Sequence, residues 1–172
     1  VCIDKSGSMS TNRMDWALAV AEALRQVALQ DGRDYHAVFF DGRVKPNYIF
    51  HFPGGRSPGV DQLLSFLSVV SGGGTEFADA LDAALDIIEK SPTEEGKRAD
   101  IVFITDGDDF VEDEWLTQYR TRKTAAEVKT LGVHIADKGD RPSQALRDVT
   151  DAIIPAYALT SDEAKDVFTF VA

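Results

Sequence analysis

Stretches with the apolar pattern of a β-strand alternate with stretches that have the pattern of an α-helix, almost from end to end of the chain. Ile101 to Ile104 is a short, wholly apolar run rich in β-branched residues, which is typical of a strand covered on both faces in a parallel sheet. From Glu76 to near Pro92, apolar residues instead recur at the i, i+3, i+4 and i+7 positions of a helix. Parallel strands joined through helices need crossover connections. The sequence therefore predicts a doubly wound α/β fold.

The same patterns locate the other elements. Strands are predicted at Val1 to Ile3, Tyr35 to Phe40, Val44 to Phe52, Gly132 to Ala136 and Ala152 to Leu159, and helices at Arg13 to Gln30, Val60 to Val70, between residues 105 and 131, after Pro142 and from Ser161. Asp41-Gly42 is the strongest short-range hairpin signal in the chain. The expected architecture is Rossmann-like, with a mostly parallel central sheet, one antiparallel edge strand and helices on both faces.

The size and charge of the chain narrow its possible partners. Its 172 residues are expected to form a single domain, cut from a longer protein because the sequence starts inside a strand pattern. No run approaches the roughly 18 apolar residues of a transmembrane helix, so membrane insertion is not expected. With 18 Lys and Arg against 29 Asp and Glu, the net charge is −11, which disfavours nucleic acid as a partner. A single cysteine and the absence of an Asn-x-Ser/Thr site favour a cytoplasmic setting, with an extracellular one left open.

Three loops that follow predicted strands or precede predicted helices carry hydroxyls, carboxylates and glycines. They are residues 4–10, 72–75 and 105–109. Ligands of open α/β sheets bind beyond the carboxyl ends of the strands, so these loops are expected to converge there. Every group they offer is a hard oxygen, which suits Mg²⁺ or Mn²⁺, with Ca²⁺ also possible, better than it suits zinc. The sequence therefore predicts a divalent-cation site.

The pattern Asp4-x-Ser6-x-Ser8, with Thr75 after a glycine run and Asp106-Gly after an apolar strand, resembles the metal-ion-dependent adhesion site of von Willebrand factor A-type domains. The resemblance implies that Ser6 and Ser8 bind the cation directly and that Thr75 does so in one conformational state. It also implies that Asp4 and Asp106 act through water or exchange with it, and that an Asp or Glu of a protein partner takes the sixth position. Neutral hydroxyls leave the charge of the ion partly uncompensated, so a partner carboxylate would complete both coordination and charge.

Within that family, the chain is similar in style to intracellular bacterial members that accompany MoxR-type AAA+ ATPases, since it is acidic and lacks cysteine pairs. The resemblance implies a protein-protein interaction module that is not an enzyme. It further implies an adaptor that presents a client to a remodelling ATPase. An adhesin-like module that recognises an extracellular ligand is one alternative.

The alternative from another class is a Mg²⁺-dependent phosphotransferase with Asp4 as the nucleophile. In haloacid-dehalogenase-type enzymes a second Asp, two residues after the nucleophile, acts as the acid. Ser6 stands at that position and cannot serve as the acid.

Other polar residues are expected to have structural roles. Thr75 is also well placed to cap the helix at Glu76. Without metal, the carboxylates of the loops are expected to repel one another, and Asp108 and Asp109 are expected to be solvated. The three histidines, His36, His51 and His134, stand singly on predicted strands without the spacing of metal ligands, and each is expected to be a packed or edge residue.

Overall fold

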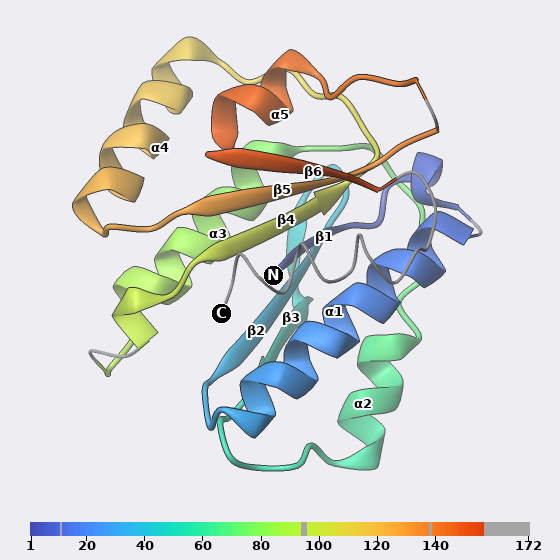
Figure 1. The fold of residues 1–172 in the computed structure, drawn as a ribbon, viewed down its shortest axis with the longest axis vertical. Helices are drawn as coiled ribbons and strands as arrows, with labels where there is room; N and C mark the ends of the chain where they lie inside the picture. Colours follow the sequence, from blue (N-terminus) through green and yellow to red (C-terminus); the bar gives the residue numbers. More distant parts are fainter. Residues whose placement is uncertain (11, 94–95, 138, 157–172) are drawn as a thin grey trace.

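Six strands form one sheet in this computed structural model, which describes residues 1–10, 12–93, 96–137 and 139–156. Their order is β3-β2-β1-β4-β5-β6 (Figure 1). Only β3 pairs antiparallel, with β2, and the other four pairings are parallel. The predicted mostly parallel sheet with one antiparallel edge strand is confirmed.

The elements lie close to their predicted positions. The strands are β1 (Cys2–Asp4), β2 (Tyr35–Phe40), β3 (Val44–Phe52), β4 (Ile101–Thr105), β5 (Thr130–Ile135) and β6 (Ala152–Ala156). The helices are α1 (Asn12–Gln30), α2 (Val60–Leu67), α3 (Phe77–Glu89), α4 (Asp113–Ala125) and α5 (Gln144–Val149), with short 3-10 helices η1 (Gly7–Met9) and η2 (Gly96–Arg98). The predicted helix from Ser161 lies outside the described residues, as does the end of the last predicted strand.

Several predicted boundaries were wrong by one to three residues, and two of them show why. Helix α2 ends at Leu67 and not at Val70. The two valines that follow are β-branched and weak helix formers, and Val69 packs into the core beyond the helix. Strand β5 starts at Thr130, two residues before the predicted Gly132, because the backbone of Thr130 pairs with β4 opposite Ile101.

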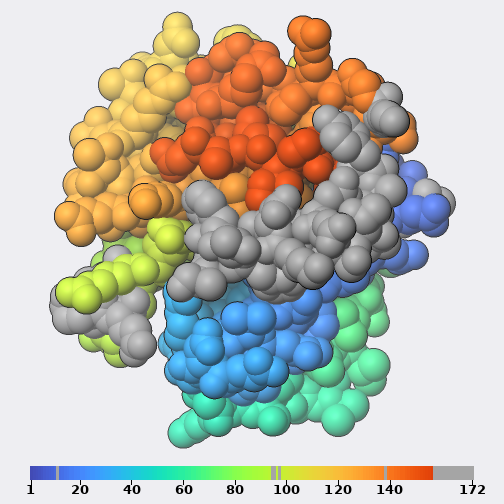
Figure 2. All heavy atoms as spheres, in the orientation of Figure 1, coloured from blue at the N-terminus to red at the C-terminus, as the bar shows by residue number. Residues whose placement is uncertain are grey.

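Helices cover both faces of the sheet, as Figure 1 shows. The residues of β2 alternate between the two faces: Phe39 belongs to the core cluster that includes α1 and α2, whereas Phe40 packs in the cluster with α3, α4 and α5. Figure 2 shows the surface of α1 and α2 gathered at one end of the molecule and that of α4, α5 and β6 at the other. No helix of the described part has the length and hydrophobicity needed to cross a membrane.

Strand β1 is the point at which the winding of the sheet reverses. It lies between β2 and β4, with Ile3 opposite Phe39 on one side and Ile104 on the other. All three of its residues are fully buried. The loops that follow β1 and β4 therefore leave the sheet beside each other, at the position where doubly wound folds bind ligands.

A cluster of aromatic rings fills the core on the side of the sheet that α3 covers. This cluster leads to a prediction about stability. Phe103 stacks on Phe40, with centroids 5.0 Å apart, and meets the edge of Phe77 at 4.9 Å. We expect Phe103→Ala to lower the free energy of unfolding by about 3–5 kcal/mol, because it removes a fully buried ring and leaves a cavity. Urea denaturation measures this loss.

The matched control is Phe110→Ala, since Phe110 is 84% exposed. It should change the free energy of unfolding by no more than about 0.5 kcal/mol. Similar losses in the two variants would contradict the assignment of Phe103 to the core.

Candidate metal centre

Asp4 is a fully buried carboxylate at the carboxyl end of the central strand. Its Oδ1 accepts a hydrogen bond from the backbone N–H of Ser6 at 2.7 Å, and its Oδ2 accepts one from the hydroxyl of Thr105 at 2.5 Å. Burial raises the pKa of Asp4, and these two hydrogen bonds oppose that shift. The carboxylate is therefore held in one orientation, between the first loop and the end of β4.

The next three oxygen donors lie beside one another. Helix η1 turns the chain after Ser6, so that its Oγ lies 3.0 Å from the Oγ of Ser8. The Ser8 hydroxyl donates to Asp106 Oδ1 at 2.9 Å. Adjacent ligands of an octahedral Mg²⁺ ion at 2.0–2.1 Å stand about 2.9 Å apart. The donor set and its spacing thus fit Mg²⁺.

Thr75 reaches the same region from the second loop. The backbones of the two loops pair, since Gly7 N donates to the carbonyl of Gly73 at 3.1 Å. A Cβ placed on Gly107 would lie 3.6 Å from both Thr75 Oγ1 and Asp4 Oδ2. The structure therefore brings all five predicted ligands to the ends of β1 and β4, with Thr75 on the side opened by the missing side chain of Gly107.

Lys5 joins the first loop to the end of β2 through a buried ion pair and also contacts the second loop. Lys5 Nζ lies 2.5 Å from Asp41 Oδ2 and 3.4 Å from the carbonyl oxygen of Gly72. Burial alone would raise the pKa of Asp41, but the hydrogen bond from Lys5 holds it below its ordinary value. The backbone of Gly73 passes close to the side chain of Asp41, and its φ angle is 99°. A Cβ at residue 73 would lie 2.9 Å from the Asp41 side chain. Glycine is therefore required at this crossing.

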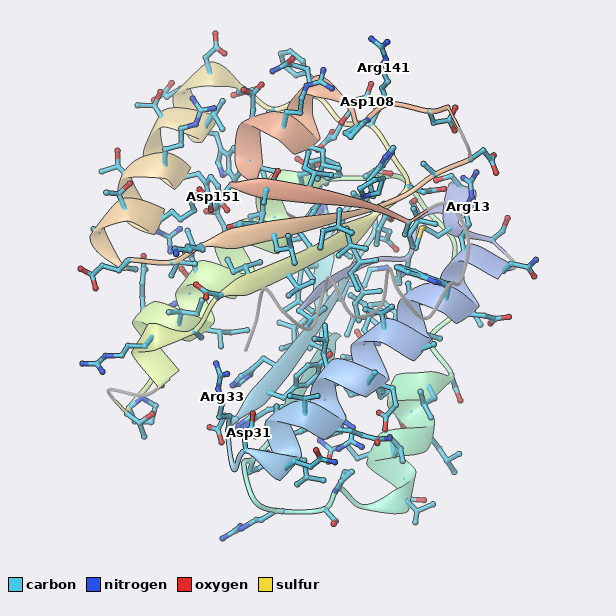
Figure 3. The ribbon with its side chains drawn as sticks, viewed as in Figure 1. Arg13, Asp31, Arg33, Asp108, Arg141 and Asp151 are labelled. Atoms are coloured by element: carbon cyan, nitrogen blue, oxygen red, sulfur yellow. The ribbon has the colours of Figure 1, made fainter. Side chains whose placement is uncertain are left out.

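The site contains a residue that the sequence patterns did not indicate, Arg13, which lies in the first turn of α1 (Figure 3). Its guanidinium forms an ion pair with Asp106 Oδ2 and lies 3.1 Å from Asp137 Oδ2. The hydrogen bond with Asp106 raises the pKa of Arg13. The expected repulsion between the loop carboxylates is therefore reduced, because the charge of Asp106 is compensated. The signal available in the sequence was a cation in the first turn of the helix that follows the loop.

The prediction that Asp109 is only solvated was wrong. Its Oδ2 accepts a hydrogen bond from the backbone N–H of Phe77 at 2.7 Å, at the first turn of α3. The N-cap residue of α3 is Glu76, whose side chain makes no cap hydrogen bond, so Thr75 precedes the cap position. Asp108 is exposed, and its Oδ1 accepts from the backbone N–H of Asp109 at 2.9 Å. Asp109 thus satisfies a helix end and ties the third loop to α3.

The expectation that His36 and His51 stand singly was also wrong. They are directly opposite each other in the β2–β3 ladder. Their rings stack with centroids 4.2 Å apart and an interplanar angle of 4°. Burial, and next the neighbouring His51, lower the pKa of His36 to about 4. His134 on β5 is buried, as expected for a packed histidine.

Comparison with known proteins assigns the chain to a family. The sequence model of a family described as the von Willebrand factor type A domain matches residues 1–108. Two uncharacterized proteins of Methanocaldococcus jannaschii are 34% and 30% identical to it over 168 residues, which is 98% of this chain. The chain spans 40% and 36% of the length of those relatives. A regulatory protein ViaA of Proteus mirabilis is 34% identical over 106 residues, 62% of this chain and 20% of that protein.

Solved structures share the fold. A von Willebrand factor type A protein from Catenulispora acidiphila matches with a TM-score of 0.68 and 16% identity, over 99% of this chain and 41% of that chain. The SpRpn10 VWA domain matches with a TM-score of 0.70 and 14% identity, over 96% of this chain and 92% of that chain. At these identities the agreement concerns the arrangement of strands and helices alone.

The contact between Asp109 and α3 indicates a structural role for Asp109, and a mutation can distinguish this role from that of a metal ligand. We expect Asp109→Ala to lower the free energy of unfolding by about 0.5–2 kcal/mol, because it leaves a helix N–H without its acceptor. The loss should be the same in EDTA and in Mg²⁺, and chemical denaturation in both buffers measures it. Asp108→Ala is the matched control and should cost at most about 0.5 kcal/mol. A loss seen in Mg²⁺ alone would instead make Asp109 part of the cation site.

Proposed function

Because this chain belongs to the von Willebrand factor type A family, we propose that it is a divalent-cation-dependent protein-binding module with a metal-ion-dependent adhesion site. The observation that carries the proposal is the spacing of Ser6, Ser8 and Asp106, which matches the edges of an octahedral Mg²⁺ site beside a buried carboxylate. The ligands that we assign are Asp4, Ser6, Ser8, Thr75 and Asp106. The ion is Mg²⁺, with Mn²⁺ as its closest substitute.

The residues around the site determine what the bound ion can do. Its chemistry is that of a Lewis acid that accepts one more oxygen ligand. Asp106 already shares its charge with Arg13, and the serines are neutral. The ligand set therefore compensates little more than one charge of a divalent ion. An Asp or Glu side chain of a partner would supply the missing charge and one further oxygen ligand.

The same geometry supports binding and not phosphoryl transfer. A nucleophilic carboxylate needs an oxygen that a substrate can approach. Asp4 has no exposed surface, and each of its oxygens accepts a hydrogen bond from the protein. We therefore assign no catalytic role to Asp4.

We further propose that the partner is a MoxR-type AAA+ ATPase or the client of one. The similarity to proteins named regulatory protein ViaA in Proteus mirabilis and Photorhabdus laumondii supports a regulatory adaptor. An adaptor needs a contact that can be made and released, and a metal-bridged carboxylate with an exchangeable ligand offers one.

Saturation with Mg²⁺ should stabilise the domain. At ten times the dissociation constant, binding to the folded state alone adds roughly 1.4 kcal/mol, which is a rise of about 3–6 °C in melting temperature for a chain of this size. Ser6→Ala and Asp4→Asn should abolish the rise, and Asp4→Asn should leave the melting temperature in EDTA unchanged or higher. Differential scanning calorimetry in EDTA and in Mg²⁺ measures both quantities.

Asp108→Asn is the matched control, because it removes a carboxylate from the same loops without touching an assigned ligand. It should keep the full Mg²⁺ response. A rise that survives in Ser6→Ala and Asp4→Asn would place the cation elsewhere. Hydrolysis of a generic phosphate ester that Asp4→Asn abolishes would contradict the proposal that the chain is not an enzyme.

Capture of the partner should depend on the same residues. A MoxR-type ATPase from the same genome, with and without its client, should bind the immobilised chain in Mg²⁺ and be released by EDTA. Ser6→Ala should weaken capture by at least tenfold, whereas Asp108→Asn should not. Equal capture in EDTA and Mg²⁺ would show that the interface does not use the cation.

A further inference from the structure

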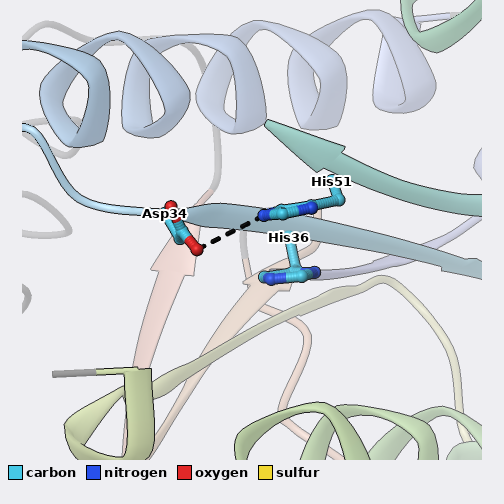
Figure 4. Close-up of side chains that lie close together, drawn as sticks. All are labelled: Asp34, His36 and His51. Atoms are coloured by element: carbon cyan, nitrogen blue, oxygen red, sulfur yellow. Dashed lines mark hydrogen bonds and ion pairs between the residues drawn. The ribbon is translucent and has the colours of Figure 1, made fainter. Parts of the chain in front are cut away.

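A second group of metal-ligand side chains lies at the other end of the sheet. Asp34, His36 and His51 each offer one ligand atom, and these atoms all lie within 4.8 Å of one another (Figure 4). No other three His, Cys, Asp or Glu side chains in the described part of the chain meet this condition. Figure 3 shows Arg13 at the start of α1 and Arg33 beyond its end. That helix has 19 residues and is about 28 Å long, so this group and the adhesion site cannot share an ion.

The pairing of β2 with β3 creates the group. His36 stands opposite His51 across the ladder, and side chains of paired residues point to the same face. Asp34 precedes His36 by two residues, so it is on that face as well. Asp34 Oδ2 and His51 Nε2 are 3.3 Å apart. The three side chains therefore converge from the start of β2, the residue that precedes it, and the end of β3.

The donors suit a transition metal. Two imidazoles and one carboxylate form a set that Zn²⁺ and its neighbours Co²⁺, Ni²⁺ and Cu²⁺ accept. In a tetrahedral site with metal–ligand bonds of about 2.0–2.2 Å, the ligand atoms lie roughly 3.4 Å from one another. The distance between Asp34 Oδ2 and His51 Nε2 is close to this value. The rings of His36 and His51 are stacked, so rotation of the His36 ring about its side-chain torsions must bring its nitrogen to the same point.

One ligand is already oriented, and an ion can reach the group. Asp34 Oδ1 accepts a hydrogen bond from the backbone N–H of Gly54 at 2.8 Å, which leaves Oδ2 turned toward the histidines. Contacts of this kind orient metal ligands in known sites. The side chains of His51 and Asp34 are 48% and 52% exposed.

We propose that Asp34, His36 and His51 bind a first-row transition-metal ion, with Zn²⁺ as the reference ion, and that this ion fastens the end of β3 to the start of β2. A fourth position is left for water or for a ligand of a partner. The proposal is independent of the function assigned to the other end of the sheet. The alternative to this proposal is a purely structural cluster, in which Asp34 only stabilises the β2–β3 hairpin through its contacts with Gly54 and His51.

The test is titration of the purified chain with Zn²⁺ by calorimetry, in saturating Mg²⁺, with Co²⁺ absorption in the visible region as a second signal. We expect one equivalent of Zn²⁺ to bind and Co²⁺ to show the intense d–d bands of a four-coordinate site. His51→Gln and His36→Gln should each weaken Zn²⁺ binding by at least tenfold and abolish those bands. Asp34→Asn should also weaken Zn²⁺ binding. The fold of this variant should be preserved, because the amide oxygen of the new side chain can still accept the hydrogen bond from the backbone N–H of Gly54.

The controls separate this site from other causes. Asp31→Asn removes an exposed carboxylate just beyond α1 and should leave Zn²⁺ binding unchanged. Ser6→Ala should also leave it unchanged, which keeps the outcome separate from that of the adhesion site. Zn²⁺ binding of equal strength in the wild type, His51→Gln and Asp34→Asn would overturn the proposal. So would the absence of Zn²⁺ binding by the wild type.

Discussion

The buried carboxylate of Asp4 is the constraint on which the arrangement of the site depends. A charge without surface exposure is tolerated only where hydrogen bonds replace water. Here the backbone of Ser6 and the hydroxyl of Thr105 provide them. The first contact forces the loop after β1 to turn back at once, and the second fixes the end of β4 beside it. Two of the three loops are thereby positioned by one side chain.

Paired charges position the remaining parts. Lys5 joins the loop after β1 to Asp41 at the end of β2, and Arg13 joins the start of α1 to Asp106 at the end of β4. Each cation comes from the first loop or its helix, and each anion comes from the end of another strand. The Lys5–Asp41 pair is buried, and breaking a buried pair leaves an uncompensated charge at a cost of about 3–5 kcal/mol. The strand ends are therefore held together even in a chain with a net charge of −11.

The sequence was sufficient for the elements and for the convergence of the three loops that carry the five proposed ligands, because periodicity locates strands and helices and the α/β rule locates the loops. It was not sufficient for contacts that depend on register. Phe40 pairs with Val44 beside the turn, and a regular ladder from that pair would place His36 opposite Tyr48. Val38 instead pairs with Ile49, an irregularity that moves His36 by three residues to face His51. Pro46 lies in this stretch without an N–H for the ladder, and no local pattern gives the size of such a shift.

Arg13 makes cation binding and partner binding depend on each other in the proposed site. While its guanidinium holds Asp106 Oδ2, Asp106 offers the ion only Oδ1, which already accepts from Ser8. In the proposed site, an ion would then be held chiefly by neutral hydroxyls and by the field of Asp4, so its affinity without a partner would be low. An incoming carboxylate contributes charge to the ion and, because the Arg13 side chain is 34% exposed, meets a second cation beside it. A coupling free energy is reciprocal. The factor by which the carboxylate raises the affinity for the cation is therefore the factor by which the cation raises the affinity for the carboxylate. The proposed adhesion site would thus be suited to capture an acidic side chain and to release it when either component is withdrawn.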